Sequence, residues 1–250
     1  MAAAQQQKRV AAPAESEKAA FMPEKPVAIL DAGAQYGKVI DRRVRELSVE
    51  TVLLPLDTPA SELSGFAGLI VSGGPQSVYA ADAPKYDPAI FTLGLPLLGI
   101  CYGMQLLNFA SGGTVEPHAA GREDGAFEIS LSGGCALFDG LGASTEVLLT
   151  HGDSVGTLPD GFRAVATSGP ITVAMEHAAK KLYGVQFHPE VDLSVDGTAM
   201  LKNFAAPIGI ILNCLLSRYV LKNSTFKMNK LFLLGTTLVL MALGMFSASA

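Results

Sequence analysis

Cysteines are few in this sequence, and their spacing excludes two common structural uses. The sequence has an odd number of cysteines, namely Cys101, Cys135 and Cys214, and no two of them form a C-x-x-C pair. The sequence therefore predicts neither a disulfide framework nor a cysteine zinc site. Unpaired thiols also indicate a reducing compartment, and we expect a cytoplasmic, cytosolic protein.

Positive charge is also scarce. The 250 residues contain 18 lysines and arginines against 23 acidic residues, which gives a formal net charge of −5. A phosphate backbone is bound by a concentrated positive surface, so nucleic acid is not an expected partner. The sequence has no H-x-x-x-H or clustered carboxylate pattern either, and we expect no metal site.

The length allows one substantial folded core with at most an appended segment. Residues 1–25 are rich in Ala, Gln, Lys and Glu, and we expect a disordered leader there. Over residues 26–204, short apolar runs alternate with helical stretches, which predicts an α/β domain with a central, mostly parallel sheet flanked by helices. The strands expected in the first half are Val27 to Leu30, Thr51 to Leu54, Leu69 to Ser72 and Leu97 to Ile100.

The segment from Tyr36 to Leu47 places its apolar residues on one side at helical spacing, which predicts an amphipathic crossover helix. The second half has more strand character, and we expect several of its strands to pair in antiparallel fashion. The strands expected there are Ala126 to Leu131, Glu146 to Thr150, Arg163 to Thr167, Thr172 to Glu176 and Leu182 to Phe187.

A G-x-C-x-G motif follows the apolar strand that ends at Ile100. Cys101 lies between Gly99 and Gly103, and a helix is expected from Met104 to Ala110. This order is typical of a nucleophile elbow, a strained turn from strand to helix in which neighbouring backbone leaves no room for a Cβ atom. A thiolate there gains from the helix dipole, and the next N–H group, that of Tyr102, can donate to an oxyanion. The motif alone fits a buried structural thiol equally well.

A partner for the thiol follows the strand expected from Leu182 to Phe187. His188 stands at that strand end and can accept the thiol proton and then pass it to a leaving group, while Glu190 can orient the imidazole. The other histidines have weaker settings: His118 and His177 are expected at the surface or in loops. His151 follows a strand and fits either the wall of the same cleft or a simple strand-end turn.

These motifs resemble those of the class I glutamine amidotransferases. The resemblance rests on the stretch from Gly99 to Gln105 and on His188-Pro189-Glu190, and it runs from about Val27 to Phe204. Within that family, the segments Ile29 to Tyr36, Ser72 to Tyr79 and Thr150 to Val155 are most similar to the amidotransferase domain of the GMP synthetases, particularly the eukaryotic ones.

The resemblance implies a flavodoxin-like fold and a glutaminase that needs no cofactor. L-Glutamine would be the substrate, Cys101 the nucleophile, His188 the acid and base, and Glu190 the group that orients it. Backbone N–H groups of Gly74 and Tyr102 would form the oxyanion hole. The remaining positions that match walls of the substrate pocket are Gly73, Gln105, His151, Gly152 and Asp153.

In that family, an ATP pyrophosphatase, present as a second domain or as a separate chain, uses the released ammonia. It needs ATP and Mg²⁺, converts XMP to GMP in purine biosynthesis, and carries a Ser-Gly-Gly-Val-Asp-Ser loop that this sequence lacks. We therefore expect the glutaminase half-reaction here and not the complete ligase reaction. Two alternatives remain open, namely a catalytically silent or regulatory fragment and a hydrolase of γ-glutamyl peptides.

Residues 205–250 depart from the family. Leu231 to Ala250 carries no charge and matches the length of about 20 residues that a membrane-spanning helix takes. With Met228-Asn229-Lys230 before it, the stretch resembles a secretory signal peptide at the wrong end of the chain. A membrane anchor, an alternatively spliced tail and a gene model that joins unrelated coding sequence are the three interpretations, and we favour the last two.

Overall fold

The centre of the fold is a set of strands that are buried on both faces. In the computed structural model, which describes residues 25–34, 36–117 and 122–206, β1 (Val27–Asp31), β3 (Gly68–Val71) and β4 (Leu97–Ile100) have almost no exposed side chain. Such continuous burial is typical of parallel strands covered by helices on both sides.

These strands belong to a nine-stranded sheet with the order β2-β1-β3-β4-β11-β10-β9-β6-β7. The first five strands of that order are parallel and the others pair in antiparallel fashion. A separate antiparallel pair is formed by β5 (Val115–Pro117) and β8 (Asp153–Val155). The remaining strands are β2 (Thr51–Pro55), β6 (Glu123–Leu131), β7 (Ser144–His151), β9 (Arg163–Ser168), β10 (Ile171–His177) and β11 (Leu182–Val185).

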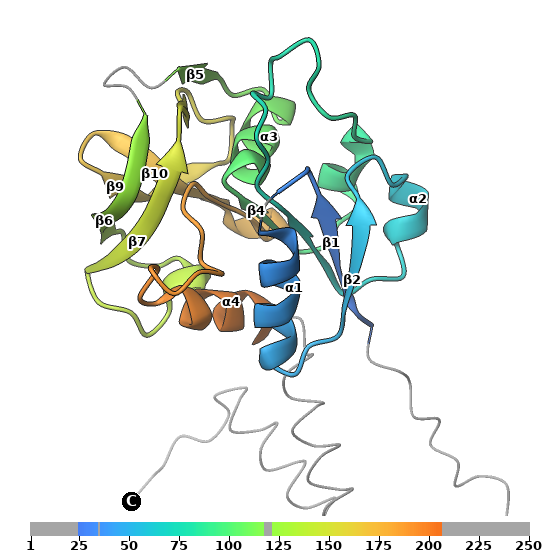
Figure 1. Ribbon diagram of the computed structural model, residues 1–250, viewed down its shortest axis with the longest axis horizontal. Helices are drawn as coiled ribbons and strands as arrows, with labels where there is room; N and C mark the ends of the chain where they lie inside the picture. Colours follow the sequence, from blue (N-terminus) through green and yellow to red (C-terminus); the bar gives the residue numbers. More distant parts are fainter. Residues whose placement is uncertain (1–24, 35, 118–121, 207–250) are drawn as a thin grey trace, which may run out of the picture.

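Helices cover both faces of the sheet (Figure 1). Alternate residues of β1 separate the two layers, since Val27 and Ile29 pack in one core with Ile40, whereas Ala28 and Leu30 pack in the other with Leu63. The first core is covered by α1 (Gly37–Glu46) and α4 (Gly197–Ala205), and the second by α2 (Ala60–Leu63), α3 (Tyr102–Ala110) and the 3₁₀ helix η2 (Pro88–Thr92). Two further 3₁₀ turns are η3 (Ala136–Phe138) and η4 (Ala178–Lys180).

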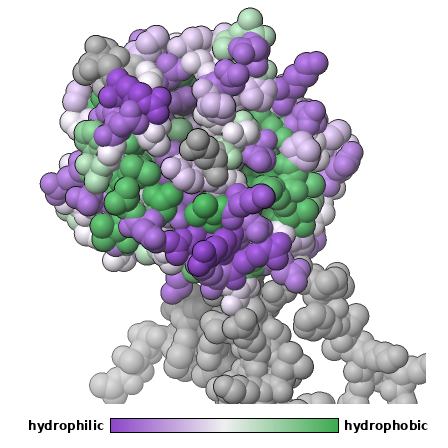
Figure 2. Space-filling view, viewed as in Figure 1, coloured by the Kyte–Doolittle hydropathy of each residue, from purple (hydrophilic) through white to green (hydrophobic). Residues whose placement is uncertain are grey.

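The outer face of α1 is charged. Arg42 pairs with Glu46 at 2.9 Å and Arg45 pairs with Asp41 at 2.9 Å, both one helical turn apart. Figure 2 shows this hydrophilic band with apolar surface on either side of it. The exposed apolar residues of the molecule include Val52 and Leu53 on β2 and Leu193 and Val195 before α4.

The predicted α/β class, the parallel first half and the antiparallel second half are confirmed. Several boundaries differ by one to three residues, and two of these differences have a clear structural cause. The helix after the elbow begins at Tyr102 and not at Met104, because Cys101 itself makes the whole turn. The strand before His188 ends at Val185 and not at Phe187, since the chain leaves β4 at that point.

The parallel strands end at one edge of the sheet, and their following loops meet there. β3 leads into Ser72-Gly73-Gly74, β4 into Cys101, and β11 into the segment that carries His188. This carboxyl edge is where open α/β sheets place their ligands.

The expected leader and the apolar tail lie outside the described residues, apart from Lys25, Ala205 and Ala206. Within the described part of the chain, no helix is long and apolar enough to cross a membrane.

Candidate active site

Cys101 occupies a strained turn between β4 and α3. Its φ of 52° and ψ of −107° lie in a region that side-chain-bearing residues rarely adopt, and such conformations cost about 1–3 kcal/mol. The surrounding backbone holds the turn, because the N–H of Cys101 donates to the carbonyl of Val185 at 2.7 Å. The thiol is thereby fixed at the carboxyl edge of the sheet.

The two glycines of the motif are required by close backbone approach. A Cβ atom on Gly99 would lie 2.4 Å from the carbonyl oxygen of Gly103, and one on Gly103 would lie 2.3 Å from that of Val71. Both distances are far below van der Waals contact. The elbow therefore depends on glycine at these positions, as the sequence predicts.

His188 and Glu190 form a buried pair beside the thiol. Nδ1 of His188 lies 2.8 Å from Oε1 of Glu190, and the side chains are 5% and 0% exposed. Because Nδ1 is used in this way, Nε2 is the ring nitrogen left to interact with Cys101. Burial alone lowers the pKa of His188, but hydrogen bonds with Cys101 and Glu190 and the charges of both groups outweigh it and raise the pKa to about 10. The surroundings of His188 therefore favour its protonated, imidazolium form.

Several contacts hold this pair in place. Nε of Arg43, on α1, donates to the carbonyl oxygen of Glu190 at 3.0 Å, and its guanidinium also pairs with Asp192. The hydroxyl of Ser194 donates to the carbonyl of His188 at 2.6 Å. The ring of Tyr36 meets the imidazole edge-on, with centroids 5.3 Å apart.

Backbone from two other segments lies close to Cys101 and His188. Tyr102 is the first residue of α3, so its N–H group has no partner within the helix. A Cβ on Gly73 would lie 3.3 Å from Cε1 of His188 and 3.6 Å from Cβ of Cys101, which places this glycine against both of these side chains. A Cβ on Gly74 would lie 2.8 Å from the carbonyl oxygen of Ala32.

Cys101 lies on the wall of a cavity of about 420 Å³. Eight of the ten predicted site residues line it, while Glu190 lies behind His188, and Tyr102 is buried with its N–H at the start of α3. The eight are Gly73, Gly74, Cys101, Gln105, His151, Gly152, Asp153 and His188, and other lining residues are Tyr36, Ser77, Arg122 and Thr150.

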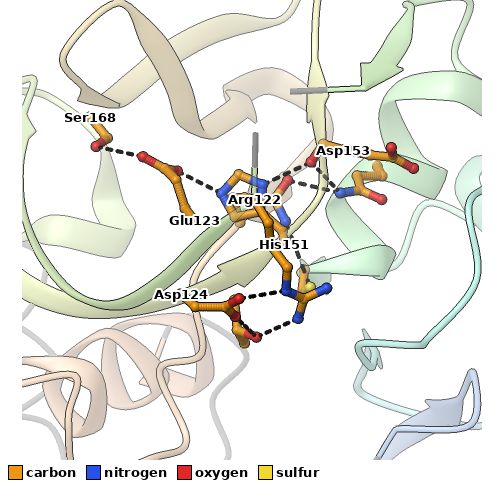
Figure 3. A network of polar contacts seen from close by, with 10 residues as sticks. Arg122, Glu123, Asp124, His151, Asp153 and Ser168 are labelled. Carbon is orange, nitrogen blue, oxygen red and sulfur yellow. Dashed lines mark hydrogen bonds and ion pairs between the residues drawn. The ribbon is translucent and has the colours of Figure 1, made fainter. Parts of the chain in front are cut away.

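His151 is a buried part of the cavity wall and not a free strand-end side chain. Its Nδ1 lies 2.8 Å from the carbonyl oxygen of Asp153, and its Nε2 lies 2.8 Å from Oε2 of Glu123. Figure 3 shows the ring between these partners. The carboxylate of Asp153 accepts hydrogen bonds from Ser77 and, at 3.0 Å, from Tyr79.

Arg122 is a cavity residue that the sequence does not single out. Its Nε donates to Asp124 at 2.6 Å and Nη2 donates to the hydroxyl of Thr150 at 3.0 Å (Figure 3). It precedes β6, whose first residue pairs with His151. The position of Arg122 at the cavity follows from the register between β6 and β7, and sequence motifs do not give that register.

One histidine differs from its predicted setting. His177 was expected at the surface or in a loop, but it ends β10 and packs edge-on against Phe162 with centroids 5.2 Å apart. Its buried Nδ1 has no hydrogen-bond partner among the residues that the structure describes. Pairing of β10 with β11 draws it into the sheet. His118 lies outside the described residues. Within the described ranges, no group of three or more His, Cys, Asp and Glu side chains could hold a metal ion.

Known proteins share much of this sequence. Residues 28–208 match the family model described as glutamine amidotransferase class-I. A probable glutamine-hydrolysing GMP synthase of Caenorhabditis elegans is 56% identical over 183 residues, which are 71% of this chain and 24% of the relative. The glutamine-hydrolysing GMP synthase of Lactococcus lactis strain IL1403 is 49% identical over 187 residues, which are 73% of this chain and 36% of the relative. The chain thus spans about a quarter to a third of these relatives.

Solved structures of other proteins share the fold of this chain. A protein of Thermoplasma acidophilum, described as one subunit of a GMP synthase, superimposes with a TM-score of 0.65 at 29% identity, and the match covers 80% of this chain and 98% of the other. A glutamine amidotransferase of Thermotoga maritima, at 21% identity and a TM-score of 0.54 over 77% of this chain and 95% of the other, shares the fold.

Proposed function

Because the chain belongs to the class I glutamine amidotransferase family, we propose that its Cys101 cavity hydrolyses L-glutamine to glutamate and ammonia. The observation that carries this proposal is the thiol on a strained elbow, beside a buried His188–Glu190 pair and on the wall of a cavity. This is the arrangement of an activated nucleophile, its acid and base, and the group that orients the base.

In the first half of the reaction, the Cys101 thiolate attacks the side-chain amide carbon of glutamine. A C–S bond forms, and the carbonyl oxygen becomes an oxyanion that can accept from the N–H groups of Tyr102 and Gly74. His188 gives its proton to the amide nitrogen, which leaves as ammonia when the C–N bond breaks. A γ-glutamyl thioester remains on Cys101.

In the second half, water hydrolyses the thioester. Neutral His188 takes a proton from the water as its oxygen attacks the thioester carbon, and the C–S bond then breaks. Glutamate leaves and the thiolate and imidazolium are restored. The sum is one glutamine and one water consumed for one glutamate and one ammonia, and no step needs a cofactor.

The charges of the cavity suit the head group of an amino acid. Among the described residues that line it, Arg122 is the only lysine or arginine, and Asp153 is the only aspartate or glutamate. We assign Arg122 to the α-carboxylate and Asp153 to the α-ammonium group of glutamine, since opposite charges at one mouth fit a zwitterion. Gln105, His151, Gly152 and Gly73 complete the walls.

The ammonia would serve the synthetase reaction that the relatives' names indicate. We assign conversion of XMP to GMP, with its ATP and Mg²⁺, to an ATP pyrophosphatase domain or subunit corresponding to the part of those relatives that this chain does not span. The described cysteines, Cys101 and Cys135, are free thiols, which supports a place in the reducing cytosol.

The test is release of ammonia and glutamate from glutamine by the purified chain. We expect activity in the wild type and its loss in Cys101→Ala, and a glutamine analogue with an electrophilic carbon should alkylate Cys101. A folded wild type that neither hydrolyses glutamine nor is alkylated would be a silent fragment. A clear preference for γ-glutamyl peptides over free glutamine would instead identify a peptide hydrolase.

A further inference from the structure

We propose that Gln186 is a positioning residue for the nucleophile: its side-chain N–H holds the sulfur of Cys101 in the orientation that faces His188 and the cavity. The inference rests on the proposed function, because it concerns the same thiol. Gln186 is not among the residues that line the cavity, so its role acts through Cys101.

Gln186 lies directly behind the thiol. It is fully buried, and its Nε2 lies 3.6 Å from Sγ of Cys101, which is hydrogen-bonding distance for a sulfur acceptor. Its backbone is fixed as well, since its N–H donates to the carbonyl of Val173 at 2.8 Å and the preceding residue, Val185, accepts from Cys101. Backbone hydrogen bonds therefore fix the position of Gln186 relative to Cys101.

The direction of the Gln186 amide is determined by its neighbours. Nε2 of Gln105 lies 2.9 Å from the carbonyl oxygen of Asp153 and 3.1 Å from Oε1 of Gln186. A carbonyl oxygen only accepts, so the nitrogen of Gln105 must face it, and its second hydrogen is then directed to the oxygen of Gln186. The nitrogen of Gln186 is thereby turned to the sulfur.

The hydrogen-bonded amides of Gln186 and Gln105 are held in place at the Gln105 side, where Asp153 lies. The carbonyl of Asp153 that orients Gln105 also faces Nδ1 of His151, whose other nitrogen faces Glu123 on β6 (Figure 3). The Asp153 side chain is itself held by Ser77 and Tyr79. Fully satisfied buried networks are rigid, so a single orientation of the Gln186 amide is imposed from several loops.

A donor behind the sulfur has a clear use. The Cys101 side chain has three staggered rotamers, and attack needs the one directed at the substrate carbon. An N–H group stabilises a thiolate in that position, whereas an acceptor there would repel it. The network thus supplies an orientation that the elbow backbone alone does not impose on Sγ.

Gln186→Glu tests the proposal, because it keeps the shape and replaces the donor by an acceptor. We expect the variant to lose about tenfold or more in kcat with little change in KM, as fits the loss of a hydrogen bond to a charged group. Alkylation of Cys101 by iodoacetamide, which needs no substrate pocket, should slow by a similar factor. Gln186→Leu, which removes the donor without adding charge, should show a smaller loss in both measurements.

Asn108→Asp is the matched control. Asn108 is a fully buried amide on α3, the helix that follows Cys101, and it donates to the carbonyl oxygens of Thr114 and Thr157 away from the thiol. This variant should lower the unfolding temperature and leave the alkylation rate of folded protein unchanged.

The outcomes separate the two proposals. If wild type hydrolyses glutamine and folded Gln186→Glu and Gln186→Leu match it in kcat and alkylation rate, the positioning role is wrong and the proposed function stands. If wild type shows no glutaminase activity but Gln186→Glu still slows alkylation, the positioning role stands and the proposed function fails. Should the glutamate variant not fold, the leucine variant decides by the same two measurements.

Discussion

At the residue scale, the two described cysteines show how surroundings decide the chemistry of a thiol. Burial and a hydrogen bond with Glu176 raise the pKa of Cys135 to about 12, so it stays a protonated, unreactive thiol at neutral pH. Cys101 is buried as well, but it lies on the elbow beside His188 and opens to a cavity. Burial alone therefore does not separate a structural from a reactive cysteine.

The raised pKa of His188 makes a prediction for its titration. A group whose folded pKa lies above its ordinary value holds its proton through the intervening range, so His188 should remain an imidazolium from pH 6.5 up to about 10. Nuclear magnetic resonance of the imidazole nitrogens would measure the midpoint. The charge of Glu190 and its hydrogen bond with His188 both raise the pKa of the imidazole, and Glu190→Gln removes the first and weakens the second. In this variant the titration midpoint of His188 should therefore fall. We also expect kcat to fall about 100-fold.

Cys101→Ser provides the complementary titration. It removes the second group that raises the pKa of His188, so the midpoint should again move down, because burial lowers this pKa. A wild-type midpoint near 6.5 would show that the imidazole is not paired with a thiolate in the resting protein.

At the element scale, the passage from β4 to α3 is the most constrained part of the chain. Gly99→Ala would place a methyl group 2.4 Å from the carbonyl of Gly103, and neither backbone segment can move without losing strand pairing or the helix start. We expect the free energy of unfolding to fall by about 3 kcal/mol or more, as measured by denaturant titration.

Gly65→Ala is the control for that substitution. A Cβ at Gly65 has no atom within 4 Å, so an added methyl group should leave the unfolding midpoint close to that of wild type. Equal stability of the two alanine variants would mean that the elbow is not closely packed.

The elements that the sequence predicts well are those with local signals. Apolar runs located β1 and β4, and helical periodicity located α1, because each pattern lies within a few neighbouring residues. The short strands β5 and β8 and the helix α4 were not predicted. β5 and β8 have three residues each and exist because they pair with one another across a long separation, which no local pattern records.

At the scale of the whole molecule, the site joins two different parts of one sheet. The parallel part supplies Cys101 and His188, which motifs predict because each stands in a distinctive short sequence. The antiparallel extension supplies Arg122 and the wall around His151. Arg122 was missed, as was Gln186, because their roles arise from contacts between distant segments.

This division predicts a separation of kinetic effects. Arg122→Gln removes the positive charge from the mouth of the cavity without touching the His188–Glu190 pair, so we expect KM for glutamine to rise about tenfold while kcat changes little. Steady-state kinetics would measure both, with Arg42→Gln on the exposed face of α1 as a control. A fall in kcat at unchanged KM would place Arg122 in the chemical step instead.

The close backbone approach at the elbow also limits how this sequence can vary. Every amino acid other than glycine carries a Cβ atom, so any missense change in the codons of Gly99 or Gly103 introduces the same clash, whatever the chemistry of the new side chain. No neighbouring codon offers an intermediate step. Cys101 thus lies between two positions at which every amino-acid replacement is strongly destabilising. Neutral substitutions in this protein are therefore expected at other positions.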